Sequence, residues 1–369
     1  MTEPLKKTPL YFRHTALNGK MVDFGGWALP IQYTGIIAEH LWTRKSCSFF
    51  DVSHLGEFRI TGVGSFDFLQ ARLTNDLNKM TDGGMLYSFL CDEKGFTIDD
   101  ILIYRQVVED YYLIVNAANI SRDFEALTQY APSEVSLKDQ SDDTACIAVQ
   151  GPRAEAILEK LFKFSLHGLG YYRFKEEKFM NESVWVSRSG YTGEDGFEIF
   201  SSNKLAPFLW DCLVDGKNEG ALPAGLGARN TLRLEAGNAL YGHEIDSTTN
   251  PMEAGLGWAV SFDKGRFVGR DSLLKLKEKG PSRKLVGFKM LDKSIARDSY
   301  PIFKDGQKTG EVTSGSFGPS VGAGIGLGYV RKEHAAPGSR IEVQVHERRA
   351  PAEIVKRPFI LLNHKNKGI

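Results

Sequence analysis

The feature that most constrains the fold is a change of pattern near residue 280. Before it, segments with strand-like alternation are interleaved with segments whose apolar residues recur at helical spacing. Residues 275–284 are rich in charge and include Gly280 and Pro281, a composition typical of a linker. After it come only short strand-like segments, with turn residues about every ten positions. The pattern predicts an α+β body followed by a small all-β barrel or sandwich.

The α+β part reads as two similar units. Each has strands of about five residues and a helix with a buried stripe. We expect domains at residues 1–140 and 141–275, the first partly interleaved with the second, and a β domain at 285–369. The strands are expected at residues 57–60, 98–104, 111–115, 146–149, 184–187 and 197–200, and helices at 65–73, from about 119, and at 225–237.

Charge and composition argue against several classes of protein. The chain of 369 residues carries 46 Lys and Arg and 46 Asp and Glu, so no net charge draws it to nucleic acid or to an anionic membrane. It has no apolar run long enough to span a membrane and no signal-peptide core at its N-terminus. Its four cysteines are scattered, without a C-x-x-C pair, which suits a reducing compartment. We expect a cytoplasmic protein.

Metal and nucleotide sites are not indicated either. The histidines form no H-x-H or H-E-x-x-H pair. Alternate glycines at residues 322–328 resemble a dinucleotide fingerprint, but no helical pattern follows them to receive a pyrophosphate. We interpret this stretch as flexible turn structure.

The acidic pair Asp99–Asp100 is the strongest candidate for chemistry. Aspartate is disfavoured in strands, yet this pair opens the apolar run of residues 101–103. Because side chains alternate along a strand, one carboxylate must share the face of Ile101 and Ile103 and the other the face of Leu102. An inward carboxylate needs a partner or a function. A capping role at the preceding turn is about as plausible from the pattern alone.

Two further groups of residues are candidates for binding a ligand. Tyrosines cluster around this hairpin and are followed by Asn116, a set that can hold a flat heterocycle or can simply pack a sheet. Glu198 alternates with Phe197 and Ile199 on a strand and can face a ligand, or can pair with Arg229 or Arg233. Glu194 and Asp195, in the turn before it, are interpreted as solvent-exposed turn residues.

These segments together resemble the aminomethyltransferase, or T-protein, family of the glycine cleavage system, from end to end. The order and spacing of the motifs carry the resemblance. They are GKMVDFGGW (19–27), FDVSH (50–54), LTND (73–76), IDDIL (98–102), QGP (150–152), SGYTGEDGFE (189–198), GLGAR (225–229), RLEAG (233–237) and LYGHE (240–244).

The resemblance implies two ferredoxin-like α+β lobes and a C-terminal β-barrel around a central folate channel. It implies transfer of a methylene group from the aminomethylated lipoyl arm of H-protein to tetrahydrofolate, with release of ammonia and without metal or nucleotide. Asp100 is the implied catalytic carboxylate. The implied folate-binding residues are Tyr87, Tyr112, Asn116, Glu198 and Arg229, with Tyr191 and Trp258 as further wall residues.

Related functions remain as alternatives. A folate-dependent demethylase or methyltransferase of the same superfamily would share the folate pocket. A non-catalytic folate-binding factor for iron–sulfur assembly would carry a cysteine where this chain reads Arg188-Ser189-Gly190-Tyr191. A mitochondrial location would apply to a eukaryotic source. The chain end around His364 lacks the aromatic group often found there in the family, so no folate contact is assigned to it.

Overall fold

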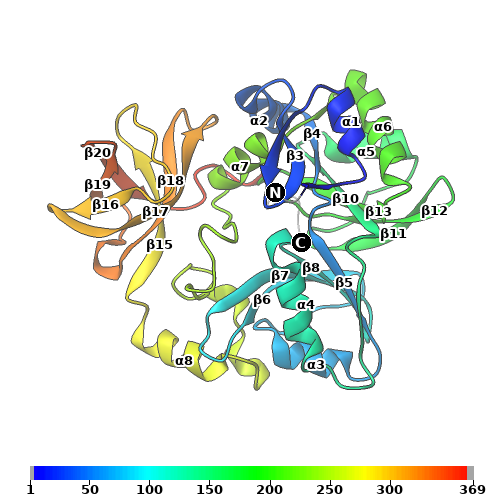
Figure 1. Ribbon diagram of the computed structural model, residues 1–369, viewed down its shortest axis with the longest axis horizontal. Coiled ribbons are helices and arrows are strands. Elements are labelled where there is room, and N and C mark those ends of the chain that lie inside the picture. The colour runs from blue at the N-terminus through cyan, green and yellow to red at the C-terminus, as the bar shows by residue number, and fades with distance from the viewer. Residues whose placement is uncertain (1–3, 364–369) are drawn as a thin grey trace.

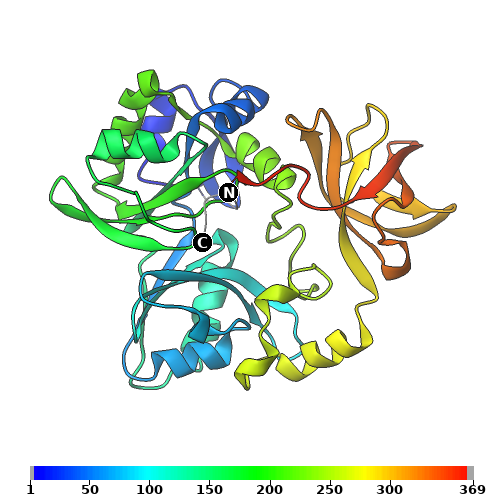
Figure 2. The ribbon, with the colours of Figure 1, turned by 180° about the vertical axis from the view of Figure 1, so that it is seen from behind.

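The computed structural model describes residues 4–363 and shows three lobes arranged in a triangle (Figure 1). His364 therefore lies outside the described residues. One lobe is built on a five-stranded sheet, the second on a six-stranded sheet, and the third is a barrel. A loop-rich segment after α7, ending in helix α8, runs from the second lobe past the first to the barrel. The last described residues return from the barrel to the second lobe (Figure 2), where the amide of Asn363 donates to the Gly193 carbonyl over 3.0 Å.

The five-stranded sheet is antiparallel, in the order β6-β7-β8-β5-β9. Two helices cover one of its faces, over a core that includes Phe58, Leu69, Ile101 and Leu113. The expected strands and helices of this unit are confirmed within a few residues. The bounds are β5 (Gly56–Thr61), α3 (Ser65–Arg72), β6 (Gly84–Cys91), β7 (Thr97–Val107), β8 (Asp110–Val115), α4 (Ile120–Thr128) and β9 (Ser136–Asp139).

The six-stranded sheet combines segments from both sides of the first lobe. β4 lies beside β10, although the whole five-stranded sheet separates them in sequence. Helices α5 and α6 pack on it around the fully buried Trp210. The bounds are β4 (Cys47–Asp51), β10 (Thr144–Gln150), α5 (Ala154–Phe162), β11 (Phe174–Phe179), β12 (Glu182–Ser187), β13 (Gly196–Ser202), α6 (Ala206–Asp215) and β14 (Ala221–Pro223).

The N-terminal residues form a small three-stranded sheet on this second lobe, in the order β1-β3-β2. His14 of α1 donates from Nε2 to the buried carboxylate of Asp51 over 2.8 Å, which ties the segment to β4. The bounds are β1 (Lys6–Lys7), α1 (Tyr11–Ala16), β2 (Lys20–Phe24), β3 (Trp27–Gln32) and α2 (Ile36–Lys45).

Helix α7 (Leu226–Glu235) joins the second lobe to the barrel. Gly237 ends it with a positive φ of 73°, and the amides of Gly237 and Asn238 bond back to Leu234 and Arg233, as in a Schellman motif. The guanidinium of Arg233 lies 2.7 Å from Glu244 and 2.8 Å from the hydroxyl of Ser314 in the barrel. This buried pair therefore fixes the barrel against the helix.

The predicted linker at residues 275–284 is largely wrong. Helix α8 (Arg270–Lys279) runs through its first half and ends at Gly280. Leu273 is buried, whereas the charged residues of the last turn face solvent, so the charges belong to one side of an amphipathic helix. Helical periodicity, and not charge density, was the signal that mattered.

The third lobe is a closed six-stranded barrel, which decides between the two predicted β architectures and confirms the overall fold class. Five of its strands overlap the short strand-like segments that the sequence predicts at residues 285–290, 310–314, 326–330, 341–345 and 353–356. The sixth, β16, was not predicted; it starts with Pro301, which a strand tolerates at its first residue. The bounds are β15 (Arg283–Met290), β16 (Pro301–Lys304), β17 (Gln307–Gly318), β18 (Ala323–Arg331), β19 (Arg340–Val345) and β20 (Arg348–Val355).

The alternate glycines of residues 322–328 lie mostly in strand β18, not in a flexible turn as predicted. A Cβ at Gly326 would lie 2.3 Å from the Phe288 ring, and one at Gly328 would lie 2.7 Å from the Glu311 carbonyl oxygen. The glycines therefore allow close packing inside the barrel wall.

Candidate active site

The acidic pair of β7 lies where the two α+β lobes face each other. The five-stranded sheet turns its open face toward the six-stranded sheet, with Leu102, Tyr104 and Ile114 packed against Cys146 and Phe200. Asp100 shares this face, while Asp99 shares the helix-covered face and is completely buried. The predicted alternation of the two carboxylates is confirmed.

Asp100 is partly exposed and held by two donors. The hydroxyl of Tyr87 donates to its Oδ2 over 2.8 Å, and Nδ2 of Asn116 donates to its Oδ1 over 2.9 Å. Burial and the neighbouring charge of Asp99 raise the pKa of Asp100 to about 7, against the lowering effect of the two hydrogen bonds. The carboxyl is therefore poised to exchange a proton near neutral pH.

A third acid, Asp123, lies next to Asp99 of the pair. Asp99 accepts from the amide of Asn116 over 2.9 Å and from Nδ2 of Asn119 over 2.6 Å. Asp123 of α4 is also fully buried, and neither of its oxygens receives a hydrogen bond from the other described residues. Burial and the charge of Asp99 raise the pKa of Asp123 to about 10. A protonated Asp123 accounts for the missing donors, because its carboxyl O–H can donate a hydrogen bond to the carboxylate of Asp99.

The second lobe supplies the opposite side of the site. Glu198 of β13 is buried and accepts from Ser189 Oγ over 2.5 Å. Burial raises its pKa, while that hydrogen bond and the positive charge of Arg229 lower it. The guanidinium of Arg229, on α7, lies 4.7 Å from the centre of the Tyr191 ring.

The alternative that Glu198 forms a salt bridge with a helix arginine is not observed. Arg233 is paired with Glu244 instead. The guanidinium of Arg229 has no ion pair or hydrogen bond with the other described residues, so its donors remain available to a ligand.

Aromatic side chains connect the two sides. The hydroxyl of Tyr191 donates to the carbonyl of Ala239, and Trp258, 62% exposed, stacks on Tyr87 with ring centres 5.4 Å apart. Burial and the charges of Glu198 and Asp100 raise the pKa of Tyr172 to about 12. Tyr172 thus has both carboxylates as electrostatic neighbours and joins the predicted residues in one site.

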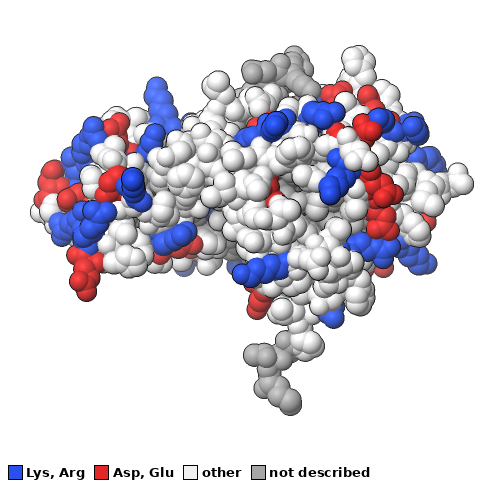
Figure 3. All heavy atoms as spheres, turned by 90° about the horizontal axis from the view of Figure 1, so that it is seen from above, with Lys and Arg blue, Asp and Glu red and all other residues white. Residues whose placement is uncertain are grey.

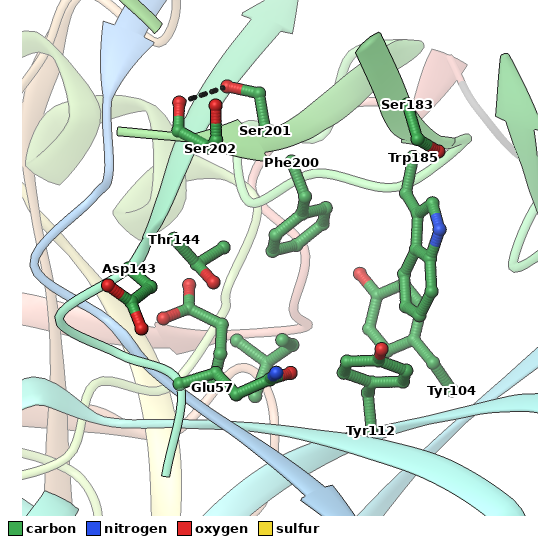
Figure 4. Close-up of a pocket in the computed structure, with 12 residues that line it drawn as sticks. Glu57, Tyr104, Tyr112, Asp143, Thr144, Ser183, Trp185, Phe200, Ser201 and Ser202 are labelled. Carbon is green, nitrogen blue, oxygen red and sulfur yellow. Dashed lines mark hydrogen bonds between the residues drawn. The ribbon is translucent and has the colours of Figure 1, made fainter. Parts of the chain in front are cut away.

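Tyr112 lies elsewhere than the other predicted residues. It is next to Tyr104 on the adjacent strand, and its ring centre is 4.0 Å from that of Trp185. These three line a separate cavity of about 290 Å³ between the lobes (Figure 4), which neither Asp100 nor Glu198 lines.

Sequence reasoning missed three of the residues described above. Asp123 and Asn119 are polar residues at a helix start, a common place for solvent-exposed side chains, and no local pattern marks them as buried. Tyr172 has a φ of 61°, which is uncommon outside glycine and asparagine, but this is visible only in the backbone.

The expectation that Glu194 and Asp195 are turn residues in water is wrong. Both are buried. Glu194 lies 3.0 Å from Arg44, and Asp195 lies 2.6 Å from Arg188. These ion pairs fix the turn that leads into β13 and so position Glu198.

Comparison with known proteins decides the family. The GCVT N-terminal domain matches residues 10–264, more than half of the chain, and the glycine cleavage T-protein C-terminal barrel domain matches residues 283–360. The chain belongs to the glycine cleavage T-protein family.

Relatives of this family extend the match over nearly the full length. An aminomethyltransferase of Halothermothrix orenii is 45% identical over 96% of this chain and 100% of its own length. One of Caldanaerobacter subterraneus is 46% identical, over 98% and 97%. The crystal structure of glycine cleavage system aminomethyltransferase T from Bartonella henselae superposes with a TM-score of 0.92, at 32% identity and over 97% and 99% of the two chains. The T-protein family is therefore shown by sequence and by fold, and the chain is an aminomethyltransferase.

Two observations concern what the described part of this T-protein-family chain lacks. Within residues 4–363, no group of three or more His, Cys, Asp or Glu side chains is placed to hold a metal ion. None of the helices in that range is both long and apolar enough to cross a bilayer. Acidic and basic residues are interspersed on the face shown in Figure 3.

Proposed function

We propose that the site around Asp100 transfers the methylene of an aminomethyl group, carried on the lipoyl arm of H-protein, to tetrahydrofolate, releasing ammonia. The observation that carries the proposal is a partly exposed carboxyl with a pKa of about 7. Tyr172 and Tyr191 link it electrostatically to the buried Glu198 and to Arg229, whose guanidinium has no ion pair with the other described residues. Tetrahydrofolate, as co-substrate, supplies the two nitrogens that become joined through the methylene carbon in 5,10-methylenetetrahydrofolate.

The residues present fit a pterin. Its flat ring carries hydrogen-bond donors and acceptors on one edge, and the site offers both kinds of partner. Glu198 supplies a carboxylate acceptor, and Arg229 supplies guanidinium donors that no other described side chain uses. Tyr191 and Tyr172 add aromatic surface beside them. We assign Glu198 and Arg229 to pterin recognition.

Asp100 is assigned to the reacting centre. Positive charge develops on the carbon as the amine departs, and a fixed carboxylate nearby stabilises that charge. With a pKa of about 7, Oδ1 or Oδ2 can also accept a proton that the reaction releases. Tyr87 and Asn116 hold the carboxyl in place through their hydrogen bonds.

The partner follows from the same chemistry. A group carried on a swinging dithiol arm must reach a carboxylate that is not sealed from solvent, and Asp100 is partly exposed. We propose lipoylated H-protein as this partner, in the cytoplasm, since the named relatives come from bacteria.

The decisive experiment measures ammonia and 5,10-methylenetetrahydrofolate formed from aminomethyl-lipoyl H-protein, with and without tetrahydrofolate. The proposal requires both products in equal amounts and a strong dependence on tetrahydrofolate. Methyl transfer from a small methylamine or sulfonium, without activity on H-protein, would favour the demethylase alternative. Folate binding without turnover on any of these substrates would favour the folate-binding factor.

A further inference from the structure

A second cavity lies between the two α+β lobes, apart from the Asp100 site. Its volume is about 290 Å³. Its floor is formed by buried residues, among them Glu57, Tyr104 and Phe200, and its rim by exposed ones such as Asp143 and Ser183 (Figure 4). A small molecule can therefore enter from solvent and reach the floor.

The floor presents an acid without a partner. Glu57 is 2% exposed, and neither of its carboxyl oxygens receives a hydrogen bond from the other described residues. Its backbone is held in place, because its amide donates to Ser141 Oγ over 3.0 Å and its carbonyl accepts from the Gln140 amide over 2.8 Å. A buried carboxyl left unpaired is costly, so such a group needs a function.

The charges around the cavity have one sign. Asp143 lies at the rim of the cavity. Burial is the main cause that raises the pKa of Glu57 well above its ordinary value, and the negative charge of Asp139 is the second. No lysine or arginine lines the cavity within the described residues. The guanidinium of Arg59 lies 5.4 Å from the centre of the Tyr112 ring but is bonded to Asp110, over 2.9 and 3.1 Å. The cavity therefore disfavours anions.

Aromatic rings form one wall. The rings of Tyr112 and Trp185 meet edge to face, with centres 4.0 Å apart, and Figure 4 shows both facing the space beside Glu57. Sites that bind an organic ammonium group combine aromatic faces with an acid. The quadrupole of the rings and the charge of the carboxylate both attract the cation.

We propose that this cavity binds a small protonated amine with an apolar body, its ammonium group paired with Glu57 and its body against Trp185 and Tyr112. The site is separate from the proposed folate site, and the inference does not depend on the proposed function. An amine in this place would supply the donors that Glu57 lacks.

The test is a ligand-observed NMR titration of the full chain, free of folate and H-protein, with benzylammonium as the probe. Benzyl alcohol and benzoate serve as neutral and anionic analogues of the same shape. We expect benzylammonium to bind at least about tenfold more tightly than either analogue, because only it pairs with the carboxyl. No binding of benzylammonium, or equal binding of benzyl alcohol, overturns the proposal.

Variants locate the site. Glu57→Gln keeps the side-chain shape but removes the carboxyl group that can ionise beside an ammonium, and Trp185→Leu removes the aromatic wall at a half-buried position. Each is expected to weaken benzylammonium by about tenfold, with circular dichroism unchanged. Asp100→Asn is the matched control, since it removes an acid from the other site; a loss of affinity there, with none in the first two variants, would place the probe at Asp100 and refute the assignment.

Discussion

The buried acid Asp123 gives the sharpest thermodynamic prediction. In the folded chain its pKa is raised from 3.8 to about 10 by burial and by the charge of Asp99. Between these values the folded chain keeps the proton, whereas the unfolded chain releases it. The contribution of Asp123 to stability is therefore complete below pH 3.8 and is lost as the pH rises toward about 10.

Asp123→Asn removes this dependence. The asparagine cannot ionise, yet its amide can donate to Asp99 as the neutral acid does. The free energy of unfolding of the variant, relative to the natural chain, should increase by about 1.4 kcal/mol for each pH unit. From pH 6 to pH 8 the gain is about 2.7 kcal/mol.

Urea unfolding at pH 6, 7 and 8, followed by circular dichroism, measures the difference. Asp67→Asn controls for the loss of one negative charge at an exposed position in the same lobe. A stability difference between the Asp123 variant and the natural chain that stays constant over this range would show that Asp123 is ionised in the fold, and would refute the reasoning.

Three other changes test separate parts of the site and fold. Tyr87→Phe removes a hydrogen bond that lowers the pKa of Asp100, so the acid limb of the pH–rate profile should move up by about one unit; an unmoved limb contradicts this. Arg229→Ala should weaken tetrahydrofolate binding at least about tenfold by calorimetry, since its free donors are assigned to the pterin, and unchanged affinity would refute that role. Lys264→Met should lower the free energy of unfolding by about 2–3 kcal/mol, because the ammonium donates to three backbone carbonyls; a neutral effect in urea unfolding would show that these bonds add little.

The local sequence pattern was sufficient to predict features that depend only on residues close together in the chain. Period-two alternation placed Asp99 and Asp100 on opposite faces of β7, and helical spacing located α3 and α7. The helix predicted at residues 225–237 ends at Gly237, where a positive φ is needed to leave the helix.

Contacts between distant segments could not be predicted in this way. Glu194 looked like a solvated turn residue because its partner, Arg44, is 150 residues away. Asp123 looked like an ordinary helix-start acid because nothing local shows that α4 covers Asp99. The approach of Glu198 toward the Asp100 side depends on how two sheets face each other, and the resemblance to a known family, not the residue pattern, pointed to it.

The central claim is that Asp100 serves the chemistry and not the fold or the binding of folate. The most direct test is turnover of Asp100→Asn with aminomethyl-lipoyl H-protein and tetrahydrofolate, followed as ammonia release, together with calorimetric folate affinity. The account predicts loss of most turnover, on the order of a hundredfold or more, with folate affinity changed by less than about threefold. Turnover close to that of the natural chain would contradict it.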